Sequence, residues 1–203
     1  MNFTALLQEF LYNQRNPDSE TAWEDVPLRE RPSFHGKLTL YASAVATFYA
    51  PSDICGVGGM RKERIRAVSS WRKEGVRYDC VFVNRDASLP GFRGLEVARV
   101  RQFFSFTSGG IFYPCALVQW FHRTADIPDT ETGMWIVERD VKADGSPFFD
   151  IIHLDSIIRA AHLLPVCGED YVPRNLVFHQ TLDAFRSFYV NKFIDHHAFE
   201  IAF

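Results

Sequence analysis

The chain has 203 residues, a mass of 23.4 kDa and a net charge of −3, with 47% hydrophobic and 23% charged residues. This length and composition exclude a disordered chain and predict one globular domain whose core needs no disulfide or structural metal. No apolar run reaches the roughly 20 residues that span a bilayer, and the first ten residues lack a secretory signal, so we expect a soluble, intracellular protein.

The N-terminal segment, residues 1–16, is predicted to be an amphipathic helix. Its apolar residues recur at helical spacing and are Phe3, Leu6, Leu7, Phe10 and Leu11. Residues 17–33 are acidic and contain prolines, which predicts an extended linker. We therefore divide the chain into an N-terminal helix with an acidic linker, 1–33, and a β-rich domain with a C-terminal helix, 34–203. The helix would pack either on this domain or on a second copy, through which the chain would self-associate.

The middle of the chain is predicted to consist of strands. Apolar and polar residues alternate with a period of two, and glycine- or proline-containing turns separate the segments. The predicted strands are 37–49, 78–84, 97–106, 112–122, 134–141 and 150–153. The clearest hairpin joins 97–106 to 112–122 across Gly109-Gly110.

The C-terminal segment is predicted to return to helix. Thr181 is a plausible N-cap, and Asp183 in the first turn favours the positive end of the helix dipole. The residues of its apolar face are Leu182, Phe185, Phe188, Tyr189 and Phe193. The predicted fold class is therefore mainly β with flanking helices (α+β).

The net charge of −3 hides an uneven distribution along the chain. Eleven of the 22 Lys and Arg residues lie between Arg61 and Arg101, against five acidic residues, so this span carries +6 and the remainder −9. A basic segment inside an acidic chain indicates either an anionic partner or a solvated face that acidic flanks neutralise.

The basic span begins directly after the glycine-rich residues 56–59. These glycines match neither the P-loop nor the dinucleotide-binding pattern, so they form either a simple turn or a looser anion-binding loop. Backbone amides and the arginines that follow would approach phosphates together. The candidate nucleic-acid-binding residues are Arg61, Lys62, Arg64, Arg66, Arg72, Lys73 and Arg77. The alternative is that these side chains pair with Glu63, Glu74 and the acidic flanks.

No catalytic residue is assigned, because the chain has no GxSxG, HExxH or local cysteine signature. The cluster most typical of metal ligands is Asp195-His196-His197, with Glu200 nearby. Adjacent histidines usually point apart, so we expect one to pack while the other meets solvent, and we expect no metal and no cofactor. The alternative is a metal-dependent enzyme that uses Asp195, His196 and His197.

The four cysteines are far apart and form no CxxC pair, which argues against a zinc ribbon or a redox site. Two disulfides would fit their even number, but nothing else indicates export. We therefore expect free, mostly buried thiols at Cys55, Cys80, Cys115 and Cys167.

Two tryptophans flank the predicted loop 126–133. Tryptophan beside a loop can form a wall for a peptide or a methylated ammonium through cation–π attraction, whereas alternating aromatics in a β-rich domain are typical of a core. The candidate peptide-binding residues are Tyr113, Trp120, His122 and Trp135.

Residues 94–100, 116–123 and 151–166, together with Glu138, resemble the bromo-adjacent homology (BAH) pattern. That family has a strand ending in Trp-Phe-Tyr-Arg, and here the strand ends in Trp-Phe-His-Arg, with His122 in place of Tyr. The resemblance implies a distorted β-barrel that binds a chromatin protein, a histone tail or another partner without catalysis.

Four further strings, 44–53, 59–67, 77–83 and 189–200, resemble the C-terminal region of proteins encoded by fungal Plavaka-type DNA transposons. This resemblance implies a mobile-element origin and a nuclear, DNA-related setting, with the transposase's catalytic acids in a region that this chain does not contain. Both resemblances imply a non-enzymatic nuclear module that recognises chromatin protein or DNA and has no membrane partner. The alternative that the second resemblance implies is an accessory part of a transposase.

Overall fold

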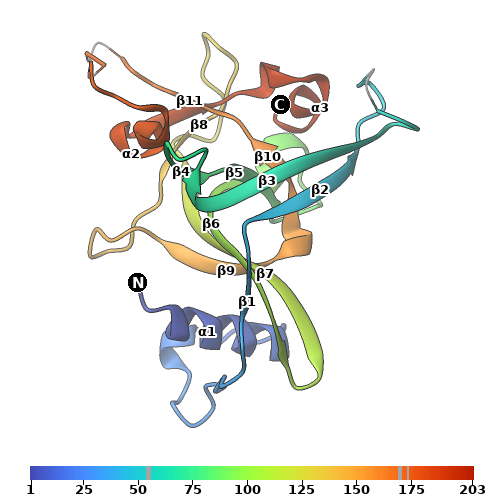
Figure 1. Ribbon diagram of the computed structural model, residues 1–203, viewed down its shortest axis with the longest axis vertical. Coiled ribbons are helices and arrows are strands. Elements are labelled where there is room, and N and C mark those ends of the chain that lie inside the picture. The colour runs from blue at the N-terminus through green and yellow to red at the C-terminus, as the bar shows by residue number, and fades with distance from the viewer. Residues whose placement is uncertain (54–55, 169–170, 173) are drawn as a thin grey trace.

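The structure is a computed structural model that describes residues 1–53, 56–168, 171–172 and 174–203. Its body is an antiparallel sheet curled into a nearly closed, barrel-like shape, with an N-terminal helix at one end and short C-terminal helices at the other (Figure 1). The predicted fold class, mainly β with flanking helices, is confirmed. None of the described helices is long and apolar enough to cross a membrane.

The main sheet closes through one bent segment of chain. Within the described residues it has nine strands, seven of which follow in the order β10-β5-β6-β7-β8-β12-β11, while β1 pairs with β6 and β9 pairs with β7. These strands are β1 (Thr39–Tyr41), β5 (Cys80–Asn84), β6 (Leu95–Ser108), β7 (Ile111–Arg123), β8 (Ile136–Arg139), β9 (Phe149–His153), β10 (Ile157–Ala161), β11 (Leu163–Pro165) and β12 (Ser187–Val190). Only His162 separates β10 from β11, although they stand at opposite ends of the order. The segment therefore pairs with β5 and then with β12, which brings the ends of the sheet together.

The hairpin predicted across Gly109-Gly110 is confirmed as β6 and β7. Ser108 is opposite Ile111, so two residues form the turn. Both have positive φ, 58° at Gly109 and 81° at Gly110. A two-residue turn of this kind needs positive φ at both central positions, which glycine adopts without steric cost.

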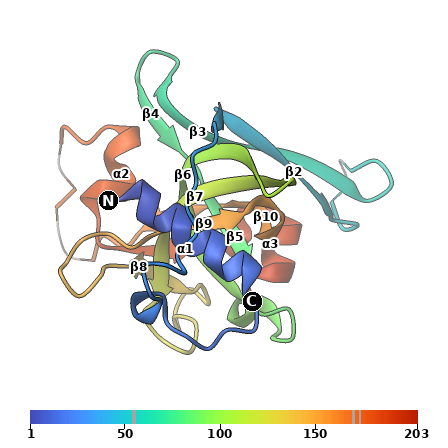
Figure 2. The same ribbon diagram turned by 90° about the horizontal axis from the view of Figure 1, so that it is seen from below.

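A second antiparallel sheet forms an arm beside the barrel. Its three strands within the described residues are β2 (Ser43–Tyr49), β3 (Met60–Trp71) and β4 (Gly75–Tyr78). The far end of β2 and β3 extends away from the barrel in both ribbon views (Figures 1 and 2). The predicted strand 37–49 corresponds to β1 and β2, but the sequence prediction contained no strand at β3.

The N-terminal helix α1 (Phe3–Arg15) lies across the β6–β7 hairpin (Figure 2). The side chain of Asn2 caps it by accepting from the N–H of Ala5 at 3.2 Å. Its buried residues are Leu6, Leu7, Phe10 and Leu11, and Phe10 packs edge-to-face on Tyr113 at 5.9 Å between ring centroids. The predicted helix is confirmed, and the chain's own sheet covers its apolar face.

The single long C-terminal helix expected from Thr181 onward is wrong. The chain forms α2 (Thr181–Ala184), then strand β12, and then α3 (His196–Ile201). Phe188 and Val190 are fully buried while Tyr189 between them is partly exposed, so the period here is two. The physical reason is that β12 fills the place between β8 and β11 and thereby completes the sheet.

Replacing Phe188 with Ala should lower the free energy of unfolding by about 3–5 kcal/mol, as expected for a fully buried phenylalanine. Urea denaturation followed by circular dichroism measures this change. The control is Phe193→Ala, whose side chain is 59% exposed and should cost about 0.5 kcal/mol or less. Equal losses in the two variants would contradict the assignment of Phe188 to the barrel core.

Candidate nucleic-acid interface

The outward face of β3 carries a line of cations. Side chains alternate across a strand, and Ile65 and Ala67 are buried in a core that the arm shares with β5, β6 and β7. Lys62, Arg64 and Arg66 therefore lie on the opposite face, where Lys62 and Arg64 are exposed and Arg66 is half-buried. We call these three residues the cationic stripe.

The neighbours of the cationic stripe on β2 are uncharged, whereas beyond β4 the carboxylate of Asp79 accepts from the backbone N–H of Arg66 at 2.9 Å. The register places Thr47, Val45 and Ser43 of β2 opposite Lys62, Arg64 and Arg66, respectively. Arg64 Nη1 donates to Ser43 Oγ at 3.0 Å. Glu63 turns to the other face, where its carboxylate accepts from the N–H of Ala160 at 3.1 Å. The acidic residue nearest in sequence is thus directed away from the stripe.

Two of the seven predicted nucleic-acid-binding side chains form ion pairs in the described part of the chain. Arg61 pairs with Asp53, and Arg77 donates from Nε to Asp79 at 2.8 Å. For the other five, no ion pair of 4.0 Å or less occurs among the residues that the structure describes; these are Lys62, Arg64, Arg66, Arg72 and Lys73. Neutralisation by acidic neighbours therefore applies to Arg61 and Arg77 and leaves five positive charges on the arm.

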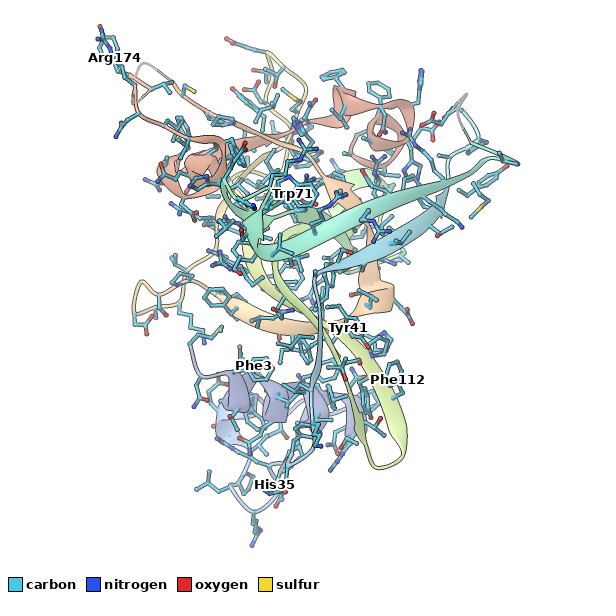
Figure 3. The ribbon with its side chains drawn as sticks, in the orientation of Figure 1. Phe3, His35, Tyr41, Trp71, Phe112 and Arg174 are labelled. Carbon is cyan, nitrogen blue, oxygen red and sulfur yellow. The ribbon has the colours of Figure 1, made fainter. Side chains whose placement is uncertain are left out.

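Trp71 continues the cationic stripe at the β3–β4 hairpin (Figure 3). Its ring is approached by three guanidinium groups, those of Arg66 at 4.5 Å, Arg77 at 5.0 Å and Arg72 at 5.5 Å from the centroid. Trp71 is partly exposed. Arginines around an exposed aromatic ring supply charge for phosphates and a flat surface for bases, the two elements of single-strand binding sites.

The turn between β3 and β4 has an unusual backbone for its residues. The N–H of Glu74 donates to the carbonyl of Trp71 at 3.0 Å, and the central residues Arg72 and Lys73 have φ of 53° and 66°. This conformation favours glycine and asparagine, and other residues adopt it at a cost. The exposed tip of the hairpin therefore carries two adjacent cations in a strained turn.

Two arginines of β6 approach the base of the same hairpin. The Arg99 side chain is 3% exposed, and its Nη1 donates to Asp183 at 2.7 Å. Arg101 falls at a bulge in the β6–β7 register, between Val100 and Gln102, and its guanidinium lies 4.4 Å from the ring centroid of Tyr78. No ion pair of Arg101 is found within the described ranges. Burial and the charge of Arg99 lower the pKa of Arg101.

The four candidate peptide-binding side chains do not share one surface. Tyr113 is buried beneath α1, in the core that contains Phe10 and Phe106. Trp135 is buried in the barrel, where its Nε1 donates to the carbonyl of Phe203 at 3.3 Å. Both rings are therefore core residues, because neighbouring elements cover them.

Trp120 and His122 line a cavity of about 330 Å³ beside β7. Trp120 is itself 4% exposed, its Nε1 donates to Asp150 at 3.4 Å, and the guanidinium of Arg85 lies 5.2 Å from its centroid. His122 is exposed, with Nδ1 3.7 Å from Asp140. The tryptophan thus presents little surface to a peptide.

The C-terminal Asp195-His196-His197 cluster is part of a buried ion-pair network. Asp195 accepts two hydrogen bonds from Arg159, at 2.7 and 2.6 Å, and one from the N–H of Ala198 at 2.8 Å. His197 stacks on Phe48, with its Nδ1 3.3 Å from Arg159 Nη1, while His196 is exposed. Among the residues that the structure describes, no group of three His, Cys, Asp or Glu could hold a metal ion.

The described cysteines are free thiols. Cys80 and Cys115 are buried, and burial raises the pKa of each to about 12. They are protonated at neutral pH, and a protonated thiol is a poor nucleophile. Cys167 is partly exposed, and Cys55, predicted to be a free thiol as well, lies outside the described residues.

No protein-family model, no curated protein and no solved structure matches this chain. The interpretation of the site therefore rests on its own residues. The sequence prediction found the charges of the arm but missed Trp71, Arg99 and Arg101. Trp71 could have been found, because it lies between the arginines at 66 and 72; the roles of the two β6 arginines depend on Tyr78 and Asp183, which are distant in the sequence.

The double variant Arg72→Asn/Lys73→Gly should be more stable than the natural chain by about 1 kcal/mol, because both new residues tolerate positive φ. Chemical denaturation provides the measurement. The control is Thr47→Gly, at an exposed and regularly paired position of β2, which should lower stability because glycine weakens a strand. A double variant less stable than the natural chain would contradict strain at this turn.

The ion pair between Arg159 and Asp195 should make stability depend on acid pH. Hydrogen bonds from Arg159, opposed by partial burial, lower the pKa of the Asp195 carboxyl from 3.8 to about 2. A carboxyl whose pKa is lower in the folded state stabilises the fold above its unfolded pKa. This contribution is lost as the pH falls from about 5 to about 2.

Asp195→Asn should therefore be less stable at neutral pH and should show a flatter decline of stability between about pH 5 and pH 2. Urea midpoints measured across this range test the expectation. Asp18→Asn, which removes an exposed carboxyl, should keep the natural profile. An unchanged slope in Asp195→Asn would show that the pair does not contribute.

Proposed function

We propose that this protein is a non-enzymatic nucleic-acid-binding module and that the cationic stripe is the surface that contacts phosphates. The observation that carries the proposal is the separation of charge on β3. Lys62, Arg64 and Arg66 share one face of the strand, opposite uncharged residues of β2, while Glu63 is held on the other face. A face of this kind keeps its positive potential for an external anion.

The spacing of the cationic stripe suits a polyanion. Alternate residues of a strand lie about 6.8 Å apart, so the three side chains form a row of charges rather than a pocket for one carboxylate. Arg72 and Lys73 extend the row to the hairpin tip. Such a row follows a phosphate backbone without reading its sequence. A histone tail is itself cationic, and this face would repel it.

On this proposal the barrel is a scaffold that holds the arm, in keeping with the resemblance to BAH domains. The resemblance to Plavaka-type transposon proteins further supports an accessory role in the nucleus, where the ligand would be the DNA of a chromosome or of the mobile element. Binding would be sequence-independent and would weaken steeply as salt rises, because each phosphate contact releases counterions.

Charge reversal at Arg64 and Arg66 should weaken binding to every DNA sequence alike. The slope of log K against log salt should fall by about 2 for duplex DNA, because each lost phosphate contact removes about 0.9. Fluorescence anisotropy with labelled duplex and single-stranded oligonucleotides, between about 50 and 200 mM salt, measures both quantities.

The control for charge reversal is the double variant Lys37→Glu/Arg93→Glu. Both residues are exposed and lie outside the β2–β3–β4 arm. This variant also replaces two cations with two glutamates, so it changes the net charge of the protein by the same amount as Arg64→Glu/Arg66→Glu. The control should bind more tightly than Arg64→Glu/Arg66→Glu. No binding of either DNA form at low salt by the folded natural chain would overturn the proposal, as would equal losses in the two double variants.

A further inference from the structure

A cavity of about 400 Å³ opens at the base of the β3–β4 hairpin, where the segment 178–182 packs across from the arm. Its walls include Trp71, Arg77, Tyr78, Arg99, Phe178 and His179. It adjoins a second cavity that shares Arg77 and Tyr78 with it and reaches Arg64 of the cationic stripe. The stripe therefore leads into an open cavity of the size that binds small organic groups.

Two buried polar atoms in the walls of this cavity have no hydrogen-bond partner in the described part of the chain. They are Arg99 Nε and His179 Nδ1. Arg99 uses its Nη1 for Asp183, and its side chain is 97% buried. A buried donor without a partner is costly, because its hydration is lost and nothing replaces it. Both atoms are covered by protein atoms, and His179 Nδ1 faces Gly75, so a ligand would reach them only after a neighbouring side chain moves.

The charge around the cavity is slightly positive. Arg101 lies beside the cavity, with its guanidinium 4.4 Å from the centroid of the Tyr78 ring. The guanidinium of Arg99, in the cavity wall, lies 5.7 Å from the same centroid. The Asp183 that pairs with Arg99 is about half exposed, so solvent weakens this compensation. The cavity is also lined by Arg72 and Arg77 and by the acids Glu74 and Asp79. With Arg99, Arg101 and Asp183 included, the cations around the cavity exceed the acids by one, and this small excess favours a phosphate over a cation.

The other walls of the cavity are aromatic. Trp71 and Tyr78 come from the hairpin, and Phe178, with 59% of its surface exposed, comes from the opposite side. Gly75 allows this approach, because a Cβ at Gly75 would collide with the ring of His179. Aromatic walls beside a phosphate site fit a nucleobase with its attached phosphate.

We propose that the cavity receives one unpaired nucleotide of a single strand whose backbone follows the cationic stripe. This inference rests on the proposed function and adds the class of nucleic acid. Bases in a duplex are stacked and paired, so they cannot enter a pocket unless they are extruded. A single strand presents its bases freely, and Trp71 and Phe178 provide surfaces for stacking.

The experiment compares a thymidine oligonucleotide with a duplex of equal length, using Trp71→Leu and Phe178→Ala. Each variant should lose about 5- to 100-fold in single-strand affinity, the range expected for one stacked base. Phe178→Ala, which changes no residue of the arm, should keep its duplex affinity. Trp23→Leu is the matched control, because Trp23 is also partly exposed and has a guanidinium, that of Arg31, at 4.5 Å. Phe199→Ala, at a phenylalanine 50% exposed on α3, is the control for Phe178→Ala.

A second measurement needs no variant. In the NMR spectrum of the natural chain, addition of the thymidine oligonucleotide should shift the Arg99 Nε–H and the His179 ring resonances, whereas the duplex should shift the cationic stripe alone. If the natural chain binds DNA but Trp71→Leu and Phe178→Ala affect both forms equally or neither, or if the Arg99 resonance stays in place, this inference fails and the proposed function stands. If neither form binds, the proposed function itself fails.

Discussion

The guanidinium of Arg159, on β10, holds the arm, the barrel and the C-terminus together. It bonds both oxygens of Asp195, lies 3.6 Å from Glu63 on β3, and lies 4.8 Å from the ring centroid of Phe48 on β2. Its side chain is 4% exposed, and a buried guanidinium is tolerated only when carboxylates and hydrogen bonds surround it. The inner face of β2 and β3 is therefore committed to the barrel, and the opposite face of β3 is left to solvent.

This division of β3 explains why a chain with a net charge of −3 has a strongly basic surface. Asp53 pairs with Arg61, and Glu63 pairs with Arg159. Both acidic side chains thus pair with arginines that lie outside the cationic stripe. The outer face has cations at alternate positions, and neighbouring like charges repel one another. Strain at Arg72 and Lys73 adds a second cost on the same surface. Costs that gather on one exposed face agree with the binding role proposed for it.

The closure of the barrel positions the other half of the site. β10 pairs with β5, and one residue later β11 pairs with β12, which brings the two ends of the sheet together. The segment 178–182, which precedes β12, lies beside Arg99 of β6. The cavity thus lies between an arm fixed by Arg159 and a cover fixed by β12. The two walls come from segments distant in the sequence, so the geometry of the cavity is a consequence of tertiary structure.

The sequence by itself determined the elements whose signals are local. The apolar spacing of α1 and the paired glycines of the β6–β7 turn act within a few residues, and both were predicted correctly. The basic span was visible as composition, but β3 was not predicted, because its charged residues masked the alternation of Ile65 and Ala67. Tertiary structure alone decided that Phe188 lies in a strand, that Tyr113 and Trp135 are core, and that Arg77 is paired while Arg66 is not. Each of these depends on a partner distant in the sequence, and neither propensity nor spacing specifies which distant segments meet when a sheet closes.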